Sequence, residues 1–276
     1  MTSKNRKGIV GRREFEKRID NFKILDDTFM NEVFKGQNDL VAMVLRTILK
    51  IDDLKVNEVR IQDPFTNWQG RGIRIDVFAQ DSTGKLYDIE IQRAKYGAGA
   101  KRARFNMSIL DVAYTRPGTV IPEPEETYIV FITEADIFCK GLPTYHVERV
   151  IQETGELFND KGHIVYLNGS YAGEDPIGLL MHDFRCSDPS KMHYGELSKR
   201  VGELKASPEW RETMCQAMED TRAEGRAEGR AEGRVEGRVE GRADALHEVY
   251  CKLVDSGMPQ AEAHKIVYGQ EPHDIQ

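Results

Sequence analysis

The sequence predicts an α/β protein in which helices flank a mixed central sheet, with a helical extension at the C-terminus. Three observations predict it. Residues 72–92 alternate between apolar and polar side chains around a short turn, which is typical of a β-hairpin. Apolar residues between positions 40 and 49 recur at the helical period, and strand and helix patterns alternate from there to residue 220. A tandem repeat with helical tendency follows.

Each element is predicted from its own pattern, in chain order. The helical pattern begins at Thr28, and its apolar stripe through residues 40–49 is expected to face the core. Pro64 and Asn67 indicate a loop at residues 63–68. Continuous apolar runs are typical of buried strands. The predicted strands are 56–61, 72–78, 86–92, 128–133 and 163–168, and the predicted helices beyond residue 50 are 97–114 and others within 190–220.

Composition divides the chain into four parts. Residues 1–21 are basic and polar, and we expect a mobile arm. Residues 22–220 hold the strand and helix patterns and predict one globular domain. Residues 221–242 form a linker made of the repeat, and residues 243–276 predict two short helices around a Gly-Met-Pro turn. We interpret these helices as a packing or oligomerisation element. A DNA-binding helix-turn-helix is the alternative, although acids outnumber lysines there.

The repeat reads Arg-Ala-Glu-Gly three times and then Arg-Val-Glu-Gly twice. On a helix each residue type drifts by about 40° per repeat, so glycine lines a slowly winding stripe. Glycines at about 1 kcal/mol each, and like charges four residues apart, make an isolated helix marginal. Packing against a second copy would bring the backbones close and pair Arg with Glu. We therefore expect a homo-oligomer through the repeat and the terminal helices, with a flexible spacer as the alternative.

Other features bear on the class of protein. The longest apolar run is interrupted by Arg46 and is too short to span a bilayer, and the N-terminus has no signal sequence, so we expect a cytoplasmic protein without a membrane partner. Four scattered cysteines indicate reduced, mostly buried thiols. The sequence has no zinc-ligand motif, no nucleophile triad and no glycine-rich nucleotide-binding loop, so a small-molecule enzyme has little support.

The hairpin carries the residues with the clearest chemistry. Its pairing places Asp76 opposite Ile89 or Glu90, depending on a one-residue bulge. Alternation puts Asp76, Glu90 and Gln92 on one polar patch of the sheet, with an apolar face behind it. Asp88 lies one pleat away and is expected to face solvent. Carboxylates held together repel unless a cation lies between them, and oxygen ligands suit Mg²⁺ or Mn²⁺.

The residues of the hairpin resemble those of a known family. The spacing of Asp76, Glu90 and Gln92 is similar to the PD-(D/E)XK nuclease signature, with Gln92 where that signature has lysine. The longer runs resemble the Rpn-like recombination-promoting nucleases and putative transposases, which carry glutamine there, over roughly residues 22 to 200. These runs are Arg74-Ile75-Asp76-Val77, Asp81-Ser82-Thr83-Gly84 and Tyr87-Asp88-Ile89-Glu90-Ile91-Gln92.

The resemblance implies a restriction-endonuclease-like core and a DNA endonuclease that depends on Mg²⁺ or Mn²⁺. Asp76, Glu90 and Gln92 would be its catalytic residues. Asp76, Glu90 and the backbone carbonyl of Ile91 would hold the cation. Asp27 is a further candidate ligand, and its alternative role is to cap the N-terminus of its helix. Gln92 can orient water through hydrogen bonds but, unlike lysine, supplies no positive charge.

Basic residues follow the hairpin directly. Net charge is −7 for the whole chain, yet residues 1–117 hold 22 Lys and Arg against 16 Asp and Glu. We interpret the basic cluster as a DNA contact, with a solvated helix face as the alternative. Because positions 102 and 104 point to different sides of a helix, only one of them is expected to face DNA. The cluster consists of Arg93, Lys95, Lys101, Arg102 and Arg104.

Two other interpretations of the hairpin stay open. It could be an ordinary solvent-facing hairpin without a site. It could also belong to a DNA-binding or assembly module that keeps the fold with a weakened or inactive site. Cation-dependent nicking of DNA that is lost in Asp76→Ala would distinguish the nuclease from both.

Overall fold

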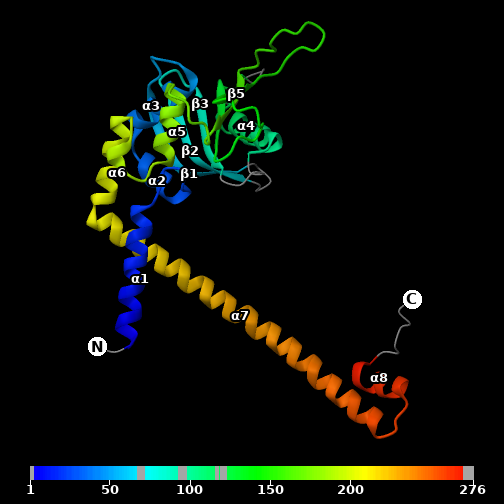
Figure 1. The fold of residues 1–276 in the computed structure, drawn as a ribbon. Helices are drawn as coiled ribbons and strands as arrows, with labels where there is room; N and C mark the ends of the chain where they lie inside the picture. Colours follow the sequence, from blue (N-terminus) through cyan, green and yellow to red (C-terminus); the bar gives the residue numbers. More distant parts are fainter. Residues whose placement is uncertain (1–2, 67–71, 93–97, 116–117, 119–122, 270–276) are drawn as a thin grey trace. The chain divides into compact units, whose positions relative to one another are not determined.

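The computed structural model describes residues 3–66, 72–92, 98–115, 118 and 123–269. The chain forms two compact units, residues 1–212 and residues 213–276, and each is described here by itself. The first unit contains a six-stranded mixed sheet flanked by helices, as the sequence predicts (Figure 1). The boundary predicted at residue 220 lies inside a helix that continues to Asp255.

The sheet has the strand order β1-β2-β3-β4-β6-β5. Its three middle strands, β3, β4 and β6, run parallel, whereas the neighbours on either side pair antiparallel. The hairpin of β2 and β3 therefore joins an antiparallel edge to the parallel centre. The strands are β1 (Val56–Thr66), β2 (Gly72–Asp81), β3 (Leu86–Gln92), β4 (Thr127–Thr133), β5 (Thr144–Val147) and β6 (Gly162–Asn168).

Helices cover both faces of the sheet. Helix α4 lies on one face, and α2, α3 and α5 lie on the other side (Figure 1). Beneath α4, Phe78, Leu86 and Phe131 form a core cluster with Met107 and Leu110. The helices are α1 (Ser3–Asp20), α2 (Asp27–Phe34), α3 (Asn38–Leu49), α4 (Ala100–Tyr114), α5 (Pro176–Arg185), α6 (Gly195–Ala206), α7 (Pro208–Asp255) and α8 (Gln260–Tyr268), with a 3₁₀ turn at Pro189–Lys191.

Two predicted elements differ from the structure near the N-terminus. The arm predicted at residues 1–21 contains α1, whose Phe15 and Ile19 side chains are buried. The helical pattern that begins at Thr28 is broken into α2 and α3 beside Gly36, which has a φ of +67° that favours glycine. The signal for this helix stop is the run of residues 35–39, which contains a glycine and no apolar residue.

The loop predicted at residues 63–68 is wrong as far as residue 66, because β1 extends to Thr66. Pro64 pairs with Arg74 in this strand. A proline has no N–H to give to a ladder, and β1 tolerates it because β1 is the edge of the sheet. Residues 67 and 68 lie outside the described residues.

Elements further along were predicted with unequal success. Strands β4 and β6 and helix α4 confirm their predictions within a few residues, whereas β5 and α5 were not predicted. The four cysteines are unpaired, as expected, but Cys139 and Cys251 are exposed rather than buried. Within the described residues, no helix combines the length and apolar character that crossing a membrane requires.

The repeat is helical. It lies within α7, a helix of 48 residues, and α8 follows after Gly257. The repeat glycines are exposed, and a Cβ added at any of them would meet nothing within 4 Å. Packing within the chain therefore does not require glycine there. These glycines are Gly225, Gly229, Gly233, Gly237 and Gly241.

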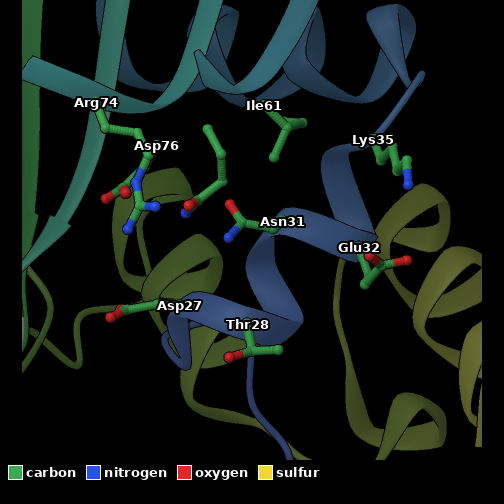
Figure 2. A pocket seen from close by; sticks show the side chains of 9 residues that line it. Asp27, Thr28, Asn31, Glu32, Lys35, Ile61, Arg74 and Asp76 are labelled. Atoms are coloured by element: carbon green, nitrogen blue, oxygen red, sulfur yellow. The ribbon is translucent and has the colours of Figure 1, made fainter. Parts of the chain in front are cut away.

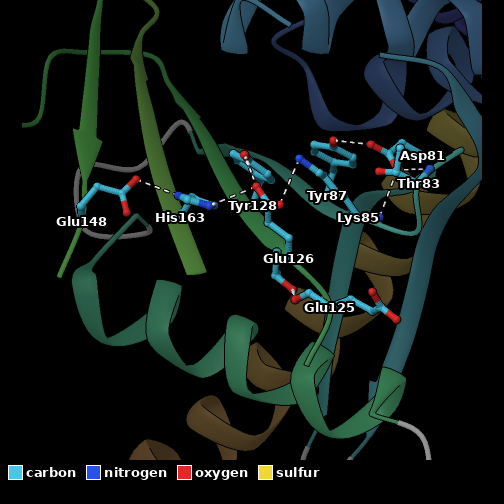
Figure 3. A network of polar contacts seen from close by, with 10 residues as sticks. Asp81, Thr83, Lys85, Tyr87, Glu125, Glu126, Tyr128, Glu148 and His163 are labelled. Carbon is cyan, nitrogen blue, oxygen red and sulfur yellow. Dashed lines mark hydrogen bonds and ion pairs between the residues drawn. The ribbon is translucent and has the colours of Figure 1, made fainter. Parts of the chain in front are cut away.

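A polar network closes the turn of the hairpin, at the end of β3 that lies far from Glu90 (Figure 3). The carboxylate of Asp81 accepts hydrogen bonds from the backbone N–H groups of Thr83 (2.8 Å) and Lys85 (3.0 Å) and from the hydroxyls of Thr83 (2.7 Å) and Tyr87 (2.8 Å). Tyr87 stacks on Tyr128, whose hydroxyl donates to Glu126 (2.7 Å). Burial and these acceptors raise the pKa of both tyrosines above its ordinary value.

Asp81→Ala is expected to destabilise the protein by about 2–3 kcal/mol, because it leaves the buried Tyr87 hydroxyl without its acceptor and opens the turn. Urea unfolding at pH 7 measures the loss. Ser82→Ala, in the same turn but exposed, is the control and should change stability by less than about 0.5 kcal/mol. Equal midpoints for the two variants would show that the network does not stabilise the hairpin.

Candidate active site

Strands β2 and β3 separate where the two predicted metal ligands meet. Their last paired residues are Val77 and Ile89, so the next residues along the two strands are Asp76 and Glu90. This register selects Glu90 over Ile89 as the residue opposite Asp76. Beyond this pair, the backbone N–H of Ile91 donates a hydrogen bond to the Asp76 side chain (Oδ2, 3.3 Å) instead of to a backbone carbonyl of β2.

Regular alternation predicts that the two carboxylates lie on one face of the sheet, and the structure differs from this prediction. Ile75 and Phe78 both belong to the cluster beneath α4, although regular alternation would put them on opposite faces. Gln62, on the neighbouring strand beside this point, has a φ of +54°, which marks a local irregularity. Glu90 consequently reaches α4, while Asp76 lines a pocket on the α2 side, and the two meet at the gap between the strands.

The backbone of Ile91 also faces this gap. In a strand, the N–H and C=O groups of one residue point to the same side, and those of the next residue point to the other. Because the N–H of Ile91 points to Asp76, its carbonyl oxygen faces the same side. The carbonyl of Gln92 points the other way and accepts from the N–H of Glu134 (3.1 Å) beyond β4.

Glu90 is the most constrained carboxylate of the site. Its side chain is 0% exposed. Its Oε2 accepts hydrogen bonds from the amide of Gln92 (3.2 Å) and from the guanidinium of Arg102. Among the described residues, no group hydrogen-bonds its other oxygen, Oε1, which is shielded from solvent. Burial and then the charge of Asp76 raise the pKa of Glu90 to about 7, against the opposing effects of Arg102 and Gln92.

This donor set fits a hard divalent cation. Burial, with a smaller contribution from the charge of Asp27, also raises the pKa of Asp76, and the charge of Asp76 in turn disfavours the ionised form of Glu90. A cation between them would relieve that repulsion. The buried Oε1 of Glu90 is an acceptor without a donor, and the carbonyl of Ile91 supplies a third oxygen on the same side. Oxygen-only ligand sets of this kind suit Mg²⁺ or Mn²⁺ better than zinc.

A pocket of about 640 Å³ opens beside Asp76. Figure 2 shows Asp27, Thr28 and Asn31 of α2 across this pocket from Arg74 and Asp76. Asp27 is the first residue of α2, and Asp26 occupies the N-cap position, so the alternative role of Asp27 as the cap is wrong. Its charge reaches Asp76, as a further ligand would require.

Asp88 is buried, so the expectation that it faces solvent is wrong. Its side chain is 0% exposed beneath α4, and its Oδ2 accepts from the amide of Asn106 (2.8 Å). The physical reason is that β3 is a central strand with helices on both faces, which a hairpin considered alone does not show. Burial and the charge of Glu90 raise the pKa of Asp88 well above its ordinary value.

The predicted basic cluster divides into residues with different surroundings. Arg93 and Lys95 lie outside the described residues. Lys101 and Arg104 are exposed on α4, whereas Arg102 forms an ion pair with Glu90. Of the two arginines on this helix, Arg104 therefore lies on the solvent side and Arg102 against the strand.

Sequence reasoning missed how α4 meets β3. Asp88 and Glu90 are two residues apart on a strand, which spans about 6.6 Å, and Arg102 and Asn106 are one helical turn apart, about 6 Å. The two pairs match in spacing and in polarity, and the structure joins them as Glu90–Arg102 and Asp88–Asn106. This match was the signal that could have identified the contact.

A second group of potential ligands lies elsewhere. Ligand atoms of His182, Asp183 and His193 all lie within 4.8 Å of one another. The carboxylate of Asp183, however, already accepts from the backbone N–H groups of His193 (2.9 Å) and Tyr194 (2.8 Å) just before α6. Those bonds give Asp183 a structural role in the turn, and we assign it no part in the site.

The strand gap, its carboxylates and the mixed sheet together define a restriction-endonuclease-like nuclease fold. The chain belongs to the family described as PD-(D/E)XK nuclease family transposase, whose model matches residues 22–171. The resemblance expected over residues 22 to 200 is thereby confirmed for most of its length. No curated protein matches the chain, and neither does any solved structure.

In the absence of divalent cations, the protein is expected to lose stability as the pH rises from about 5 to 8. The pKa of Glu90 is about 7 in the folded protein and near 4.5 unfolded, so the folded state binds the extra proton and loses this advantage as the pH passes 7. Thermal unfolding in EDTA at several pH values measures the effect, expected to be a few kcal/mol at most.

Glu90→Gln cannot ionise at this position and is the control. It should reduce this pH dependence and leave the part that comes from the raised pKa values of Asp76 and Asp88. Mg²⁺ should stabilise the wild-type protein at pH 8 more than it stabilises this variant. Identical pH profiles for the two proteins would contradict the raised pKa of Glu90.

Proposed function

We propose that this protein is a DNA endonuclease that hydrolyses phosphodiester bonds with the help of Mg²⁺ or Mn²⁺. One observation carries the proposal: Asp76, Glu90 and the carbonyl of Ile91 converge on the gap between β2 and β3, where the buried Oε1 of Glu90 has no hydrogen-bond donor among the described residues. The family description, which names a nuclease and a transposase, supports the same class of reaction.

The reaction is a hydrolysis. Water adds to the phosphorus and loses a proton to solvent, one P–O ester bond breaks, and the leaving oxygen gains a proton, giving a phosphomonoester and a hydroxyl. A bound divalent cation supplies electrophilic polarisation of the phosphate and lowers the pKa of water. Asp76, Glu90 and the Ile91 carbonyl would hold that cation, with Asp27 as a candidate fourth ligand. Gln92 donates to Glu90, and its amide oxygen can orient the attacking water.

Exposed basic residues next to the site provide a DNA contact in this proposal. Lys101 and Arg104 project from α4 into solvent, and Arg93 and Lys95 precede that helix in the sequence. Such side chains bind phosphates regardless of base sequence. Charge reversal of Arg104 should therefore weaken binding to all DNA sequences alike.

A DNA-binding or assembly module without cleavage activity is the second candidate. The observation that favours it is Gln92, which cannot place a positive charge beside the attacking water as lysine would. The two candidates differ in turnover, because both bind DNA and only one cuts it.

Asp76→Asn and Glu90→Gln are each expected to lower plasmid nicking at least 100-fold while changing DNA affinity little, because the carboxylates act mainly on the transition state. Nicking in Mg²⁺, Mn²⁺ and Ca²⁺, together with DNA binding in Ca²⁺, measures the two properties separately.

Asp52→Asn is the matched control, since it removes an exposed carboxylate away from the strand gap. It should leave both nicking and binding unchanged. Nicking that persists in Asp76→Asn would eliminate the proposed site, and a wild-type protein that binds DNA without nicking it would favour the second candidate.

We further propose that the repeat of α7 associates with a second copy of the chain. Within the repeat, each Arg and each Glu has its own kind four residues away, so the helix itself offers no favourable pair at that spacing. The exposed glycines, which no packing within the chain requires, would allow a second helix to approach closely. Pairing of Arg with Glu across two chains satisfies both sets of charges.

Replacing the five repeat glycines by alanine tests this contact. Alanine favours the helix by about 1 kcal/mol per position, so helix content should stay equal or rise, while the added methyl groups should block close approach and lower the oligomeric mass. Sedimentation and circular dichroism measure both. A truncation after Asp220 is the reference for complete loss. Unchanged mass in both variants would remove the assembly role, and collapse of DNA affinity in the truncation would make the repeat a DNA contact instead.

A further inference from the structure

The active site has one unusual charge deficit. In the PD-(D/E)XK signature, lysine occupies the position of Gln92, and an amide can donate hydrogen bonds but brings no positive charge to the negative charge that grows on a phosphate during attack. We propose that Arg102 of α4 supplies this positive charge and also positions Glu90 for the cation. This inference rests on the proposed nuclease function.

The two carboxylate oxygens of Glu90 have different surroundings. Arg102 and Gln92 both donate to Oε2, and Oε1 receives no hydrogen bond from the described residues. Two donors on a single oxygen fix the orientation of the carboxylate. They leave Oε1 as the oxygen that a cation can bind, so Arg102 orients the ligand without occupying the binding atom.

Arg102 also connects the buried site to the surface. The side chain of Glu90 is 0% exposed, while that of Arg102 is 42% exposed. A guanidinium carries five N–H donors in a rigid plane, and one of its terminal nitrogens donates to Glu90. The positive charge of this partly exposed group therefore lies beside the strand gap, where it can act on a phosphate of DNA. One group can thus orient the ligand and stabilise charge on the substrate.

The charge of Arg102 reaches the whole acidic cluster. It lowers the pKa of Asp76, Asp88 and Glu90 against the effect of burial. Arg102 therefore has the central position that a charge-stabilising group needs.

Helix α4 holds this position rigidly. Ala103 and Leu110 are fully buried against the sheet, and Asn106, one turn after Arg102, donates to Asp88. The two polar contacts lie side by side, each joining one residue of α4 to one of β3. Preorganised charges of this kind stabilise a transition state without a rearrangement at the moment of reaction.

The alternative is that Arg102 serves only to neutralise a buried carboxylate. Moving the positive charge from position 102 to position 92 distinguishes charge supply to the phosphate from neutralisation of Glu90. A lysine at position 92 can act on the phosphate from β3. The decisive variant is therefore Arg102→Gln combined with Gln92→Lys, compared with Arg102→Gln, Arg102→Lys and wild type. Single-turnover nicking of supercoiled plasmid at saturating Mg²⁺ and saturating protein is the readout.

Arg102→Gln is expected to lower the saturated rate about 100-fold, with DNA binding in Ca²⁺ changed less than threefold. Arg102→Lys should retain more activity, and adding Gln92→Lys to Arg102→Gln should recover at least tenfold. Arg149→Gln is the control, since it removes an arginine that pairs with Asp160 away from the site, and it should keep the wild-type rate.

Positioning of Glu90 is measured without activity. In EDTA at pH 8, Arg102→Gln should lower Tm by several degrees in the wild-type background and by clearly less in the Glu90→Gln background. Equal Tm losses in both backgrounds would overturn the positioning role.

Equal saturated rates for wild type and Arg102→Gln would overturn the charge-supplying role, as would a double variant no faster than Arg102→Gln. If Arg102→Gln does not fold, the rate of Arg102→Lys with and without Gln92→Lys decides. A wild-type protein that does not nick DNA would instead defeat the proposed function and the charge-supplying role with it, and the Tm measurements would then decide the positioning role alone.

Discussion

The burial of Glu90 is the constraint from which the rest of the site follows. A carboxylate at the centre of a sheet is removed from water on both faces, and its charge becomes costly unless cations or donors surround it. The structure surrounds one oxygen with Arg102 and Gln92 and brings Asp76 toward the same group. A second carboxylate at this point would be destabilising in a protein selected for stability alone, which is why the arrangement indicates a ligand.

Strand separation is what makes the carboxylates reachable. If β2 and β3 had stayed paired to their ends, the backbone of Ile91 would have been used in the ladder and the gap would not exist. The irregularity beside Gln62 and Asp76 ends the pairing, and the Asp76 carboxylate satisfies the N–H of Ile91. The polar groups released by the separation are thus the same groups that can bind a cation.

Local sequence patterns predicted the hairpin, the buried strand β4 and the approach of Asp76 to either Ile89 or Glu90, because each depends on residues close together in the chain. They did not predict the burial of Asp88, since burial depends on α4 and on the position of β3 in the sheet. The edge position that tolerates Pro64 is likewise a property of the strand order. Arg102 was interpreted as part of a DNA-binding cluster because basic residues directly follow the carboxylates in the sequence, whereas its ion pair with Glu90 depends on how the helix packs on the sheet.

The two edge strands of the sheet, β1 and β5, affect how copies of this protein can associate. A border strand normally exposes a row of N–H and C=O groups to which another chain can add. Here β1 contains Pro64 and the positive-φ residue Gln62, and the other edge strand, β5, has only four residues. Both edge strands are poor templates for strand addition. The sheet is therefore protected against growth into larger β-assemblies, and helices are left as the surfaces through which ordered association can occur.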